Sequence, residues 1–436
     1  MGFRNFIKQL DESDRLTKVS TEVSTEYEMA GVIEALGEKP VLFETVKESD
    51  IRVVAGVVSS KDLIAEALNT EKLRLLTQLS AAIENPVTPK VMDRGECQDV
   101  VEKEVDLMKL PIMRYTAKDG GKYIASAVAI IRDPEYNNRN MCFHRLMLLD
   151  KKRFAARIVE NRGTDSALKK AGGELDVAFC IGNSTAVLLS AATTLPMGVD
   201  ELGMANALEN TNLVKCKTVD LEVPAESEIV LEGRIIKEKA VEGPFLDLTG
   251  IVDRARLQPI VEIKCITHRQ NPIYQTILAG RNEHKLLMGM PKEPTIFNEV
   301  NKVCQCSDVY ITPGGCSWLH AVVKIQKKTP DDGKKAINAA FEGHKSLKHC
   351  VIVDEDINIY DPSEVEWAIA TRFQADKNAV ILSKQPGSSL DPSGDLTEGK
   401  KATTAKAGLD ATAPLVATGK GFTKEQYVRV DLNRFL

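Results

Sequence analysis

The chain has 436 residues, too many for a single hydrophobic core, so its length predicts two or three domains. Its formal net charge is -5, and no basic patch is interleaved with aromatic residues, so we expect no nucleic-acid partner. The N-terminus lacks an apolar signal core and no apolar run approaches the roughly 20 residues of a membrane span. These features favour a cytoplasmic protein without a membrane span.

The first part of the chain, residues 1–112, mixes helical and strand patterns. Residues 61–83 carry apolar side chains at helical spacing, and this segment ends before Asn85 and Pro86, as a helix should. We predict an α/β domain here.

Apolar runs of strand length dominate residues 113–303. They are residues 124–131, 146–149, 177–181, 186–191, 228–236, 260–267 and 273–278. These runs are rich in β-branched residues and are bounded by turn residues, and a single clear helix at 200–208 interrupts them. Short strands at this density predict a barrel-like β domain.

The last part, residues 304–436, alternates strand and helix patterns. Strands are expected at 321–325, 350–353 and 379–382, and helices at 331–345 and 362–372. This order predicts a parallel sheet with right-handed crossovers. The fold class is therefore mixed α/β, and the polar extension beyond Ser383 is a candidate for contacts between subunits.

The nine cysteines are scattered mostly through apolar surroundings. In a reducing compartment such residues are small core residues rather than disulfide partners. Only Cys304, Cys306 and Cys316 lie close in sequence, and their spacing is not that of a usual zinc knuckle.

Two carboxylates flank a chain breaker in the segment from Val241 to Gly250. Glu242 and Asp247 lie on either side of Gly243 and Pro244, which cannot continue a helix or a central strand. Two acids held close on a rigid turn can have their pKa values pushed apart, which suits acid/base catalysis. A solvated acidic loop is the alternative, and this segment alone does not decide.

A second polar segment runs from Asn140 to Arg145. The planar guanidinium of Arg145 could hold a carboxylate through two hydrogen bonds, although a surface arginine on a β-ribbon is equally compatible with the pattern. His144 alternates with Arg145 along the expected strand and should face the other side, so we interpret it as a structural histidine.

Small residues precede the helix at 200–208, where backbone N–H groups could approach a phosphate. Helix capping alone would also explain Asp200, and the helix dipole would explain Glu201. Lys406 lies in a segment expected to be a Gly-flanked loop, where it could neutralise a phosphate. The chain has no GxGxxG, P-loop, HExxH or GxSxG motif.

Taken together and in order, these segments resemble the UbiD-like decarboxylases, which use prenylated flavin mononucleotide (prenylated FMN). The resemblance runs from about Leu110 to Thr412. The matching segments are 119–124, the N-x4-R of Asn140 and Arg145, 195–202, 214–217, 223–225, 228–233, 242–247, 354–357, 367–372 and 406–412. The resemblance implies a split β-barrel that binds the flavin in the centre of the chain, between an N-terminal and a C-terminal α/β domain.

The resemblance also implies a metal site. Asn140 and Glu201 match ligands of Mn2+ or Mg2+ next to the flavin phosphate, and both offer the hard oxygen donors that such ions prefer. Asn161 stands where many relatives have a third, histidine ligand. A K+ ion is a further possible cofactor.

Other residues match the family's contacts to the cofactor. Pro196 and Met197 lie on the matching cofactor-side loop, Lys406 matches a contact to the phosphate, and Arg145 also belongs to the cofactor site.

Arg145, Glu242 and Asp247 match the family's catalytic arginine–acid–acid network. By this resemblance Arg145 holds the substrate carboxylate and keeps Glu242 ionised, while Asp247 delivers the proton. Leu246 replaces the family's glycine before the second acid.

The expected reaction is non-oxidative decarboxylation of an α,β-unsaturated acid. Our leading substrate is trans-anhydromevalonate 5-phosphate, giving isopentenyl phosphate in the archaeal mevalonate pathway of isoprenoid synthesis; the alternative is an aromatic acid of the 4-hydroxybenzoate type, as in ubiquinone or menaquinone pathways. A flavin prenyltransferase (UbiX-like) would supply the cofactor, and a homodimer or an assembly of dimers is expected. The rivals are a cofactor-free, glycosidase-like acid pair and a catalytically silent scaffold that binds flavin or metal.

Overall fold

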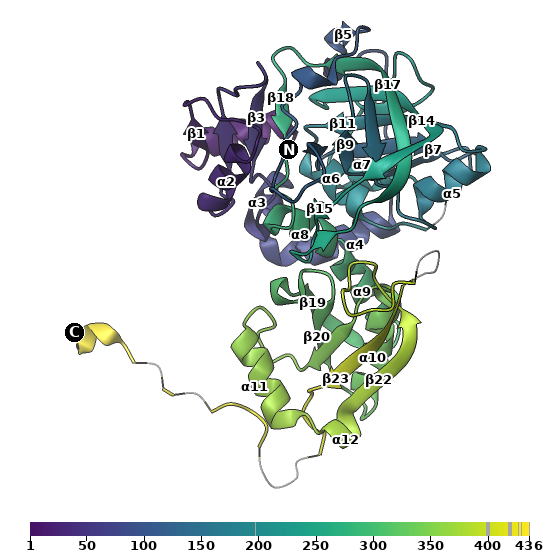
Figure 1. The fold of residues 1–436 in the computed structure, drawn as a ribbon. Coiled ribbons are helices and arrows are strands. Elements are labelled where there is room, and N and C mark those ends of the chain that lie inside the picture. Colours follow the sequence, from purple (N-terminus) through teal and green to yellow (C-terminus); the bar gives the residue numbers. More distant parts are fainter. Residues whose placement is uncertain (197, 398–401, 417–420, 426, 429, 436) are drawn as a thin grey trace. The chain divides into compact units, whose positions relative to one another are not determined.

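The computed structural model describes residues 1–436 except 197, 398–401, 417–420, 426, 429 and 436 (Figure 1). The chain divides into two compact units, one of residues 1–294 with 316–318 and the other of residues 295–315 with 319–436. Among the described residues, every helix is too short or too polar to cross a membrane.

The first unit begins with a small mixed sheet flanked by helices. The strand order is β1 (Thr17–Val19), β2 (Val41–Phe43), β3 (Arg52–Ala55) and β18 (Ile273–Gln275). The accompanying helices are α1 (Phe3–Glu12), α2 (Glu28–Ala35), α3 (Lys61–Ala67) and α4 (Leu75–Glu84), with the short 3-10 turns η1 (Lys72–Arg74), η2 (Glu96–Gln98) and η3 (Leu107–Lys109) nearby. The single helix expected at 61–83 is wrong: it is divided into α3 and α4, and Asn69 between them has a left-handed φ of 52°.

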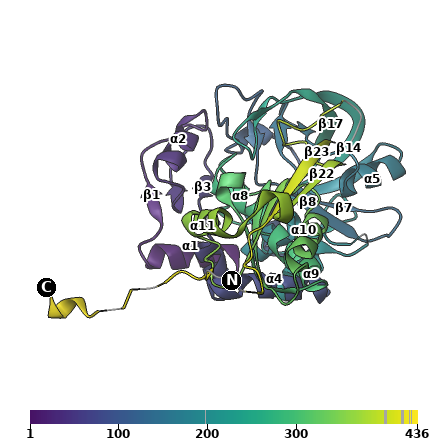
Figure 2. The ribbon, with the colours of Figure 1, turned by 90° about the horizontal axis from the view of Figure 1, so that it is seen from below.

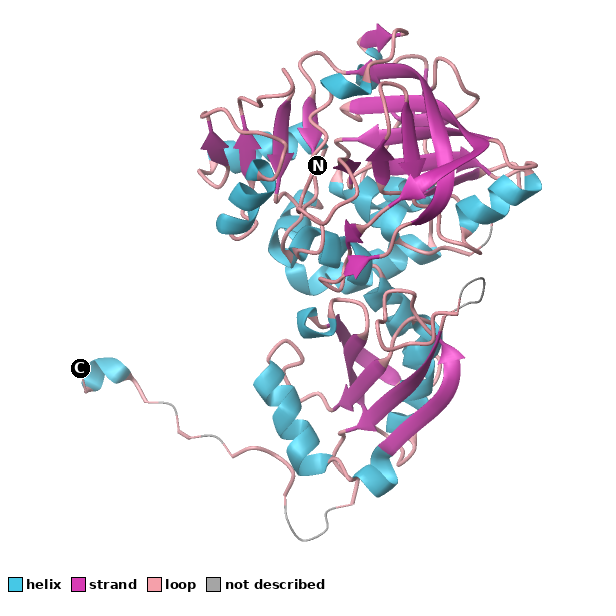
Figure 3. Ribbon diagram, viewed as in Figure 1, coloured by secondary structure: helices cyan, strands magenta, loops and turns pink. Residues whose placement is uncertain are grey.

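A large antiparallel sheet follows, curled into a half-barrel by its long strands β14 and β17 (Figures 1 and 3). Its order is β6 (Tyr123–Ile124), β9 (Leu146–Leu148), β10 (Arg153–Ala156), β17 (Arg256–His268), β14 (Ile229–Glu242), β11 (Leu175–Ile181), β7 (Val128–Arg132) and β8 (Arg139–Phe143), and β5 (Val100–Glu102) pairs with β17. The predicted β domain is therefore a split barrel. Smaller sheets join β13 (Glu222–Pro224), β12 (Leu213–Lys215) and β4 (Val91–Met92), and β15 (Phe245–Leu246) with β16 (Val252–Asp253).

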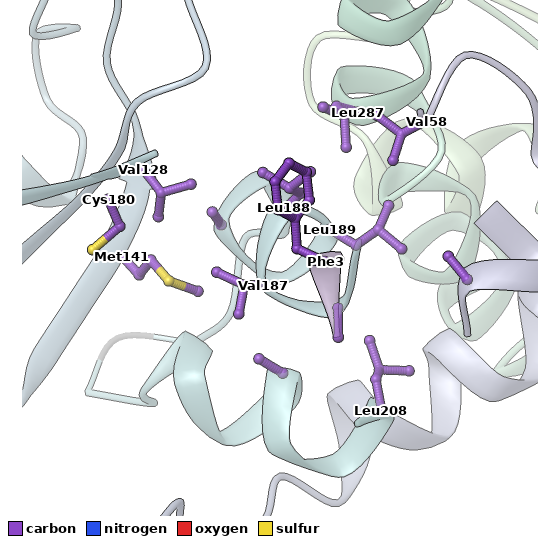
Figure 4. Packing of buried hydrophobic residues seen from close by; sticks show 14 of the residues in the cluster. Phe3, Val58, Val128, Met141, Cys180, Val187, Leu188, Leu189, Leu208 and Leu287 are labelled. Carbon is purple, nitrogen blue, oxygen red and sulfur yellow. The ribbon is translucent and has the colours of Figure 1, made fainter. Parts of the chain in front are cut away.

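Helices lie on both faces of the half-barrel sheet. Those that pack with one face are α6 (Thr185–Ala192), α7 (Glu201–Leu208) and α8 (Asn282–Gly289), which α9 (Lys292–Asn301) follows, whereas α5 (Gly163–Lys170) belongs to the apolar cluster on the other face. Val187 and Leu188 of α6 pack into the same apolar cluster as Val128, Met141 and Cys180 of the sheet (Figure 4). The strand expected at 186–191 is therefore wrong. Ser184 caps this helix by accepting a hydrogen bond from the Val187 backbone N–H at 3.4 Å.

The second unit is a sheet with helices on both faces. The strand order is β19 (Gln305–Ile311), β20 (His320–Gln326), β21 (His349–Val353), β23 (Thr403–Asp410) and β22 (Ala379–Pro386). Its helices are α10 (Asp332–Gly343), α11 (Pro362–Arg372) and α12 (Ala375–Asn378), with 3-10 turns η4 (Pro313–Gly315) and η5 (Leu432–Arg434). Ile337 of α10 packs with Ile352, and Val365 of α11 packs with Val351, so these helices cover opposite faces (Figure 2).

Two expectations for this unit need correction. β20, β21 and β23 are parallel, but β22 runs antiparallel to β23, so the expected parallel β-α-β-α-β order fails at its last strand. Lys406 lies in the middle of strand β23 and not on a loop.

The cysteines are free, as expected for small core residues. Those that are buried are Cys97, Cys180, Cys265, Cys306 and Cys350.

Candidate functional site

The turn between Glu242 and Asp247 is held rigidly by the segment around Asp119. The backbone N–H of Gly120 donates to the Pro244 carbonyl at 2.7 Å, and a Cβ at Gly120 would stand 2.1 Å from the Gly243 carbonyl oxygen, so only glycine fits there. Asp119 Oδ1 accepts from the Leu246 N–H at 3.2 Å. The acids therefore lie on a fixed turn, as the Gly-Pro pair predicted.

Arg145 joins both predicted acids. Its Nε and Nη2 donate to the two carboxylate oxygens of Glu242 at 2.8 and 3.1 Å, and its Nη1 donates to Asp247 Oδ2 at 2.7 Å. Glu242 is fully buried, and the guanidinium lies 4.8 Å from the centre of the Phe245 ring. The structure thus brings Arg145 to two acids that lie 97 and 102 residues further along the chain. A solvated acidic loop is wrong for Glu242.

Asp253 is a further member of this cluster that the sequence analysis missed. Its Oδ2 accepts from Arg145 Nη2 at 2.9 Å and from Arg256 Nη1 at 2.7 Å. Asp253 lies on β16, which pairs with β15 between the two acids, so the short hairpin that carries Asp247 also brings Asp253 to Arg145. In the sequence, the close spacing of Asp253 and Arg256 is the feature that could have indicated an ion pair here.

The charges in the cluster reinforce one another. Burial disfavours the charged form of Arg145, but the hydrogen bonds to Glu242 and the neighbouring carboxylates outweigh it and raise the pKa of Arg145. Burial also works against ionisation of Asp253, but Arg256 and Arg145 outweigh it and lower the pKa of Asp253. The site therefore keeps a permanent cation among carboxylates.

His284 borders the same cluster and was also missed. Its Nδ1 accepts from the Gly280 N–H at 3.1 Å, and burial lowers its pKa, with Asp247 opposing this shift and Arg145 adding to it. A Cβ at Gly280 would meet the Leu246 side chain at 3.3 Å. Leu246 therefore leans toward Gly280, just before helix α8, which carries His284.

The second group of predicted residues meets where β8 approaches α7. Asn140 Nδ2 donates to Glu201 Oε1 at 3.1 Å, and the Met141 N–H donates to Glu201 Oε2 at 2.8 Å. Arg139 binds Asp200, the N-cap of α7, at 2.6 Å. Three consecutive residues of β8 thus fix the start of α7.

This pair fits a divalent metal ion. Asn140 Oδ1 is buried and has no hydrogen-bond partner among the described residues, so an acceptor is left for a cation. Burial raises the pKa of Glu201 to about 8, so a carboxylate there is costly unless a positive charge compensates it. Amide and carboxylate oxygens suit Mn2+ or Mg2+.

The other predicted residues have different surroundings. Asn161 is exposed, with a φ of 60°, and its backbone N–H donates to Asp165 at 2.7 Å. Pro196 is exposed on the loop before α7, and Met197 lies outside the described residues. Lys406 belongs to the second unit, where its Nζ donates to the Lys345 carbonyl at 2.8 Å.

His144 is structural, as expected. It is buried, and its ring nitrogens lie 3.0 Å from the Arg157 carbonyl and 2.9 Å from Thr164 Oγ1. Burial lowers its pKa to about 4, so the ring is neutral at pH 7.

Comparison with known proteins identifies the family. Models of the 3-octaprenyl-4-hydroxybenzoate carboxy-lyase match successive parts of the chain: the N-terminal domain at residues 7–83, the Rift-related domain at 90–282 and the C-terminal domain at 285–411. A relative from Methanothermobacter thermautotrophicus, named anhydromevalonate phosphate decarboxylase, is 41% identical and covers 96% of this chain and 98% of its own. The chain belongs to the UbiD family.

A second relative of this UbiD-family chain carries the same name. The Methanosarcina mazei protein is 40% identical and covers 95% of this chain and 97% of its own. The family resemblance drawn from the motifs is confirmed, and the chain is placed among decarboxylases of the carboxy-lyase class.

Solved UbiD-class structures have the same fold. The enzyme HmfF from Pelotomaculum thermopropionicum in complex with FMN matches with a TM-score of 0.93 and 37% identity over 100% of both chains. An evolved dimeric form of HmfF in complex with prenylated FMN matches with a TM-score of 0.89 and 35% identity over 100% of both chains. The predicted mixed α/β fold with its central split barrel is confirmed.

Proposed function

We propose that this chain is a prenylated-FMN-dependent decarboxylase that converts trans-anhydromevalonate 5-phosphate to isopentenyl phosphate and CO2. The observation that carries the proposal is the buried fork of Arg145, which holds Glu242 and Asp247 within one half-barrel. Two relatives that match nearly the whole chain are named anhydromevalonate phosphate decarboxylase, and this name supports the substrate. UbiD-class neighbours bound to FMN and prenylated FMN support the cofactor.

When bound, prenylated FMN supplies the electron sink that the loss of CO2 needs. Asn140 and Glu201 would hold Mn2+ or Mg2+ beside the cofactor phosphate, because they offer a buried amide oxygen and a buried carboxylate. Further predicted contributors to the cofactor site are Asn161, Pro196, Met197, Lys406 and a K+ ion.

Arg145 orients the substrate carboxylate in this proposal. Its N–H groups are engaged by Glu242, Asp247 and Asp253, so a substrate carboxylate must replace one of them. Asp247 is the natural one to leave, because one hydrogen bond joins it to Arg145. Glu242 keeps two hydrogen bonds to the guanidinium and stays in place.

Asp247 then delivers its proton to the carbon that has lost CO2. Asp253 keeps its second bond to Arg256, so the guanidinium stays anchored while Asp247 moves. A positioned acid of this kind contributes roughly 10²- to 10⁴-fold in rate.

The test uses full-length protein co-expressed with a flavin prenyltransferase. We expect the mass and the absorbance of prenylated FMN on the purified protein, and CO2 release from trans-anhydromevalonate 5-phosphate but not from 4-hydroxybenzoate. If the protein decarboxylates only the aromatic acid, our alternative substrate is the correct one and trans-anhydromevalonate 5-phosphate is not. A flavin-free protein with glycosidase activity would contradict the whole proposal.

We further propose that a flavin prenyltransferase supplies the cofactor, that the chain forms a homodimer or an assembly of dimers in the cytoplasm, and that its domain limits lie near residues 112 and 303.

A further inference from the structure

Glu283 is a buried carboxylate at the start of α8 and lies outside the cluster of acids around Arg145. It is fully buried, and its two carboxylate oxygens accept hydrogen bonds from the backbone N–H groups of Gly56 at 2.8 Å and Val58 at 3.1 Å. Burial raises the pKa of Glu283 to about 7, and these two hydrogen bonds oppose the rise. Glu283 therefore ties the first turn of α8 to the loop between β3 and α3.

Glu38, on the turn between α2 and β2, completes this attachment. Its Oε2 accepts from the Glu283 N–H at 3.4 Å, one of the first N–H groups of α8, which have no acceptor within the helix. Glu38 has a left-handed φ of 58°, and a Cβ at Gly56 would stand 2.7 Å from the Glu38 carbonyl oxygen, so only glycine fits there. Val58 also packs in one apolar cluster with Leu287 of α8 (Figure 4). The start of α8 is thus held by polar and apolar contacts together.

The turn that carries Asp247 rests on the residues just before α8. A Cβ at Gly280 would stand 3.0 Å from the Asp247 carbonyl oxygen and 3.3 Å from Leu246 Cγ, so the turn lies directly against Gly280. The Gly280 N–H donates to His284 Nδ1 at 3.1 Å, which joins this contact to the first turn of the helix. A shift at the start of α8 therefore moves the support of Asp247.

We propose that Glu283 is a positioning residue for Asp247. Its carboxylate fixes the start of α8 against the loop between β3 and α3, and Gly280 transmits this position to the turn of Asp247. The inference rests on the proposed function, in which Asp247 delivers a proton. A displaced acid slows protonation but leaves Arg145 able to hold the substrate carboxylate, so the loss should fall on kcat rather than on KM.

The test variant is Glu283→Gln in the full-length protein loaded with prenylated FMN. The amide keeps the size of the side chain but offers one acceptor oxygen where two backbone N–H groups need two. The matched control is Glu232→Gln. Glu232 is also fully buried and accepts from two backbone N–H groups, those of Lys217 at 2.8 Å and Thr218 at 2.6 Å, but it lies near the opposite end of β14 from Glu242.

Steady-state kinetics at about pH 8, above the pKa of Glu283, give the first readout. We expect kcat of Glu283→Gln to fall about 10- to 100-fold, the range that a small misplacement of a reacting group can cause, with KM within about twofold of the wild type. Both constants of Glu232→Gln should stay within about twofold. A loss of stability alone would not separate kcat from KM in this way.

Hydrogen exchange followed by mass spectrometry gives a second readout that needs no turnover. In the turn, the Asp247 N–H donates to the Ile251 carbonyl at 3.1 Å and the Gly250 N–H donates to the Asp247 carbonyl at 2.9 Å. Both amides lie more than thirty residues before Glu283 in the sequence, so they report its effect only through the fold. We expect exchange in the peptide of residues 243–252 to be at least about threefold faster in Glu283→Gln and unchanged in Glu232→Gln.

Exchange of this peptide that is no faster in Glu283→Gln than in Glu232→Gln would overturn the proposal, whether or not the protein decarboxylates its substrate. In an active protein, equal kcat values of the two variants would also overturn it. A wild type without decarboxylase activity would instead contradict the proposed function, and hydrogen exchange would still decide whether Glu283 holds the turn. If Glu283→Gln does not fold, Glu38→Ala, which removes the acceptor of the Glu283 N–H, is judged by the same criteria.

Discussion

Gly163 lies directly against the carboxamide of Asn140, with space for hydrogen only between its Cα and Asn140 Oδ1. The contact fixes where the unpaired Oδ1 points, while Asn140 Nδ2 is held by Glu201 at 3.1 Å. The orientation of the amide is thus set by packing on one side and by a hydrogen bond on the other.

Gly163→Ala should therefore disturb the proposed metal site. The added Cβ would stand 2.6 Å from Asn140 Oδ1, so the amide must rotate, and we expect Mn2+ affinity to fall at least tenfold in titrations followed by electron paramagnetic resonance. Gly31→Ala is the control. It also lies in a helix, but a Cβ there meets nothing within 4 Å, so it should keep Mn2+ affinity and stabilise the fold by about 0.4–1 kcal/mol. Equal Mn2+ affinity in both variants would contradict the role of Asn140.

Glu201 should make the metal-free protein sensitive to pH. Its pKa of about 8 lies above that of an unfolded glutamate, near 4.3, so the folded state holds its proton more tightly. The resulting stability is complete below about pH 4 and is lost as pH rises toward 8. We expect the free energy of unfolding in EDTA to fall between pH 5 and 8, and Glu201→Gln to flatten this fall.

Metal binding should reverse the same titration. At pH 7, Mn2+ must displace the proton of Glu201, so calorimetry in two buffers of different ionisation enthalpy should show release of about one proton per ion. No proton release would mean that Glu201 is not a ligand.

Glu242→Gln should stop catalysis while the cofactor stays bound. The amide keeps the shape of the side chain but cannot hold the charge paired with Arg145 Nε and Nη2, so we expect kcat to fall by about 10²- to 10⁴-fold. The flavin absorbance should be unchanged. Glu262→Gln on the exposed side of β17 removes the same charge and should leave kcat within twofold. An unchanged kcat in Glu242→Gln would contradict a catalytic role for the charge of Glu242.

Asp253→Asn should weaken the anchor of Arg145 and change the pH dependence of stability. The folded pKa of Asp253 is lowered, so its contribution is complete above the unfolded pKa near 3.9 and is lost as pH falls through the lower folded value. At pH 7 we expect a loss on the order of 2 kcal/mol in urea unfolding, because Arg145 and Arg256 lose a charged acceptor. The difference from the wild type should shrink below about pH 4; a constant difference would show that ionisation is not involved.

The predicted site was recovered best where residues had local signals. Glu242 and Asp247 flank a chain breaker and Arg145 offers a planar fork, so their chemistry made them candidates. Their roles, and that of Asn140, came from the resemblance to the UbiD-like decarboxylases. Asp253 and His284 were missed because their contacts to the cluster depend on how β16 and α8 return to it, which spacing along the chain does not reveal.

The errors in the fold have physical reasons. The residues of α6 from Thr185 to Ala191 are buried on every side, so the segment lacks the one-sided pattern that distinguishes a helix from a buried strand. β22 has strand propensity, but its direction depends on the long connection to β23. Lys406 was expected on a loop because of Gly408, yet Gly408 is required in the strand, where a Cβ would meet Ile337 at 2.2 Å.

Asn140 lies on strand β8 and Arg145 follows just after it, so a short piece of backbone joins the two residues. A chain of this length spans at most roughly 17 Å, so the backbone itself limits the distance from the metal end of the site to its acid end. Side-chain substitutions can then change the chemistry of either end separately. An insertion or deletion between them would instead change the separation of Arg145 from Asn140 and turn one side chain relative to the other.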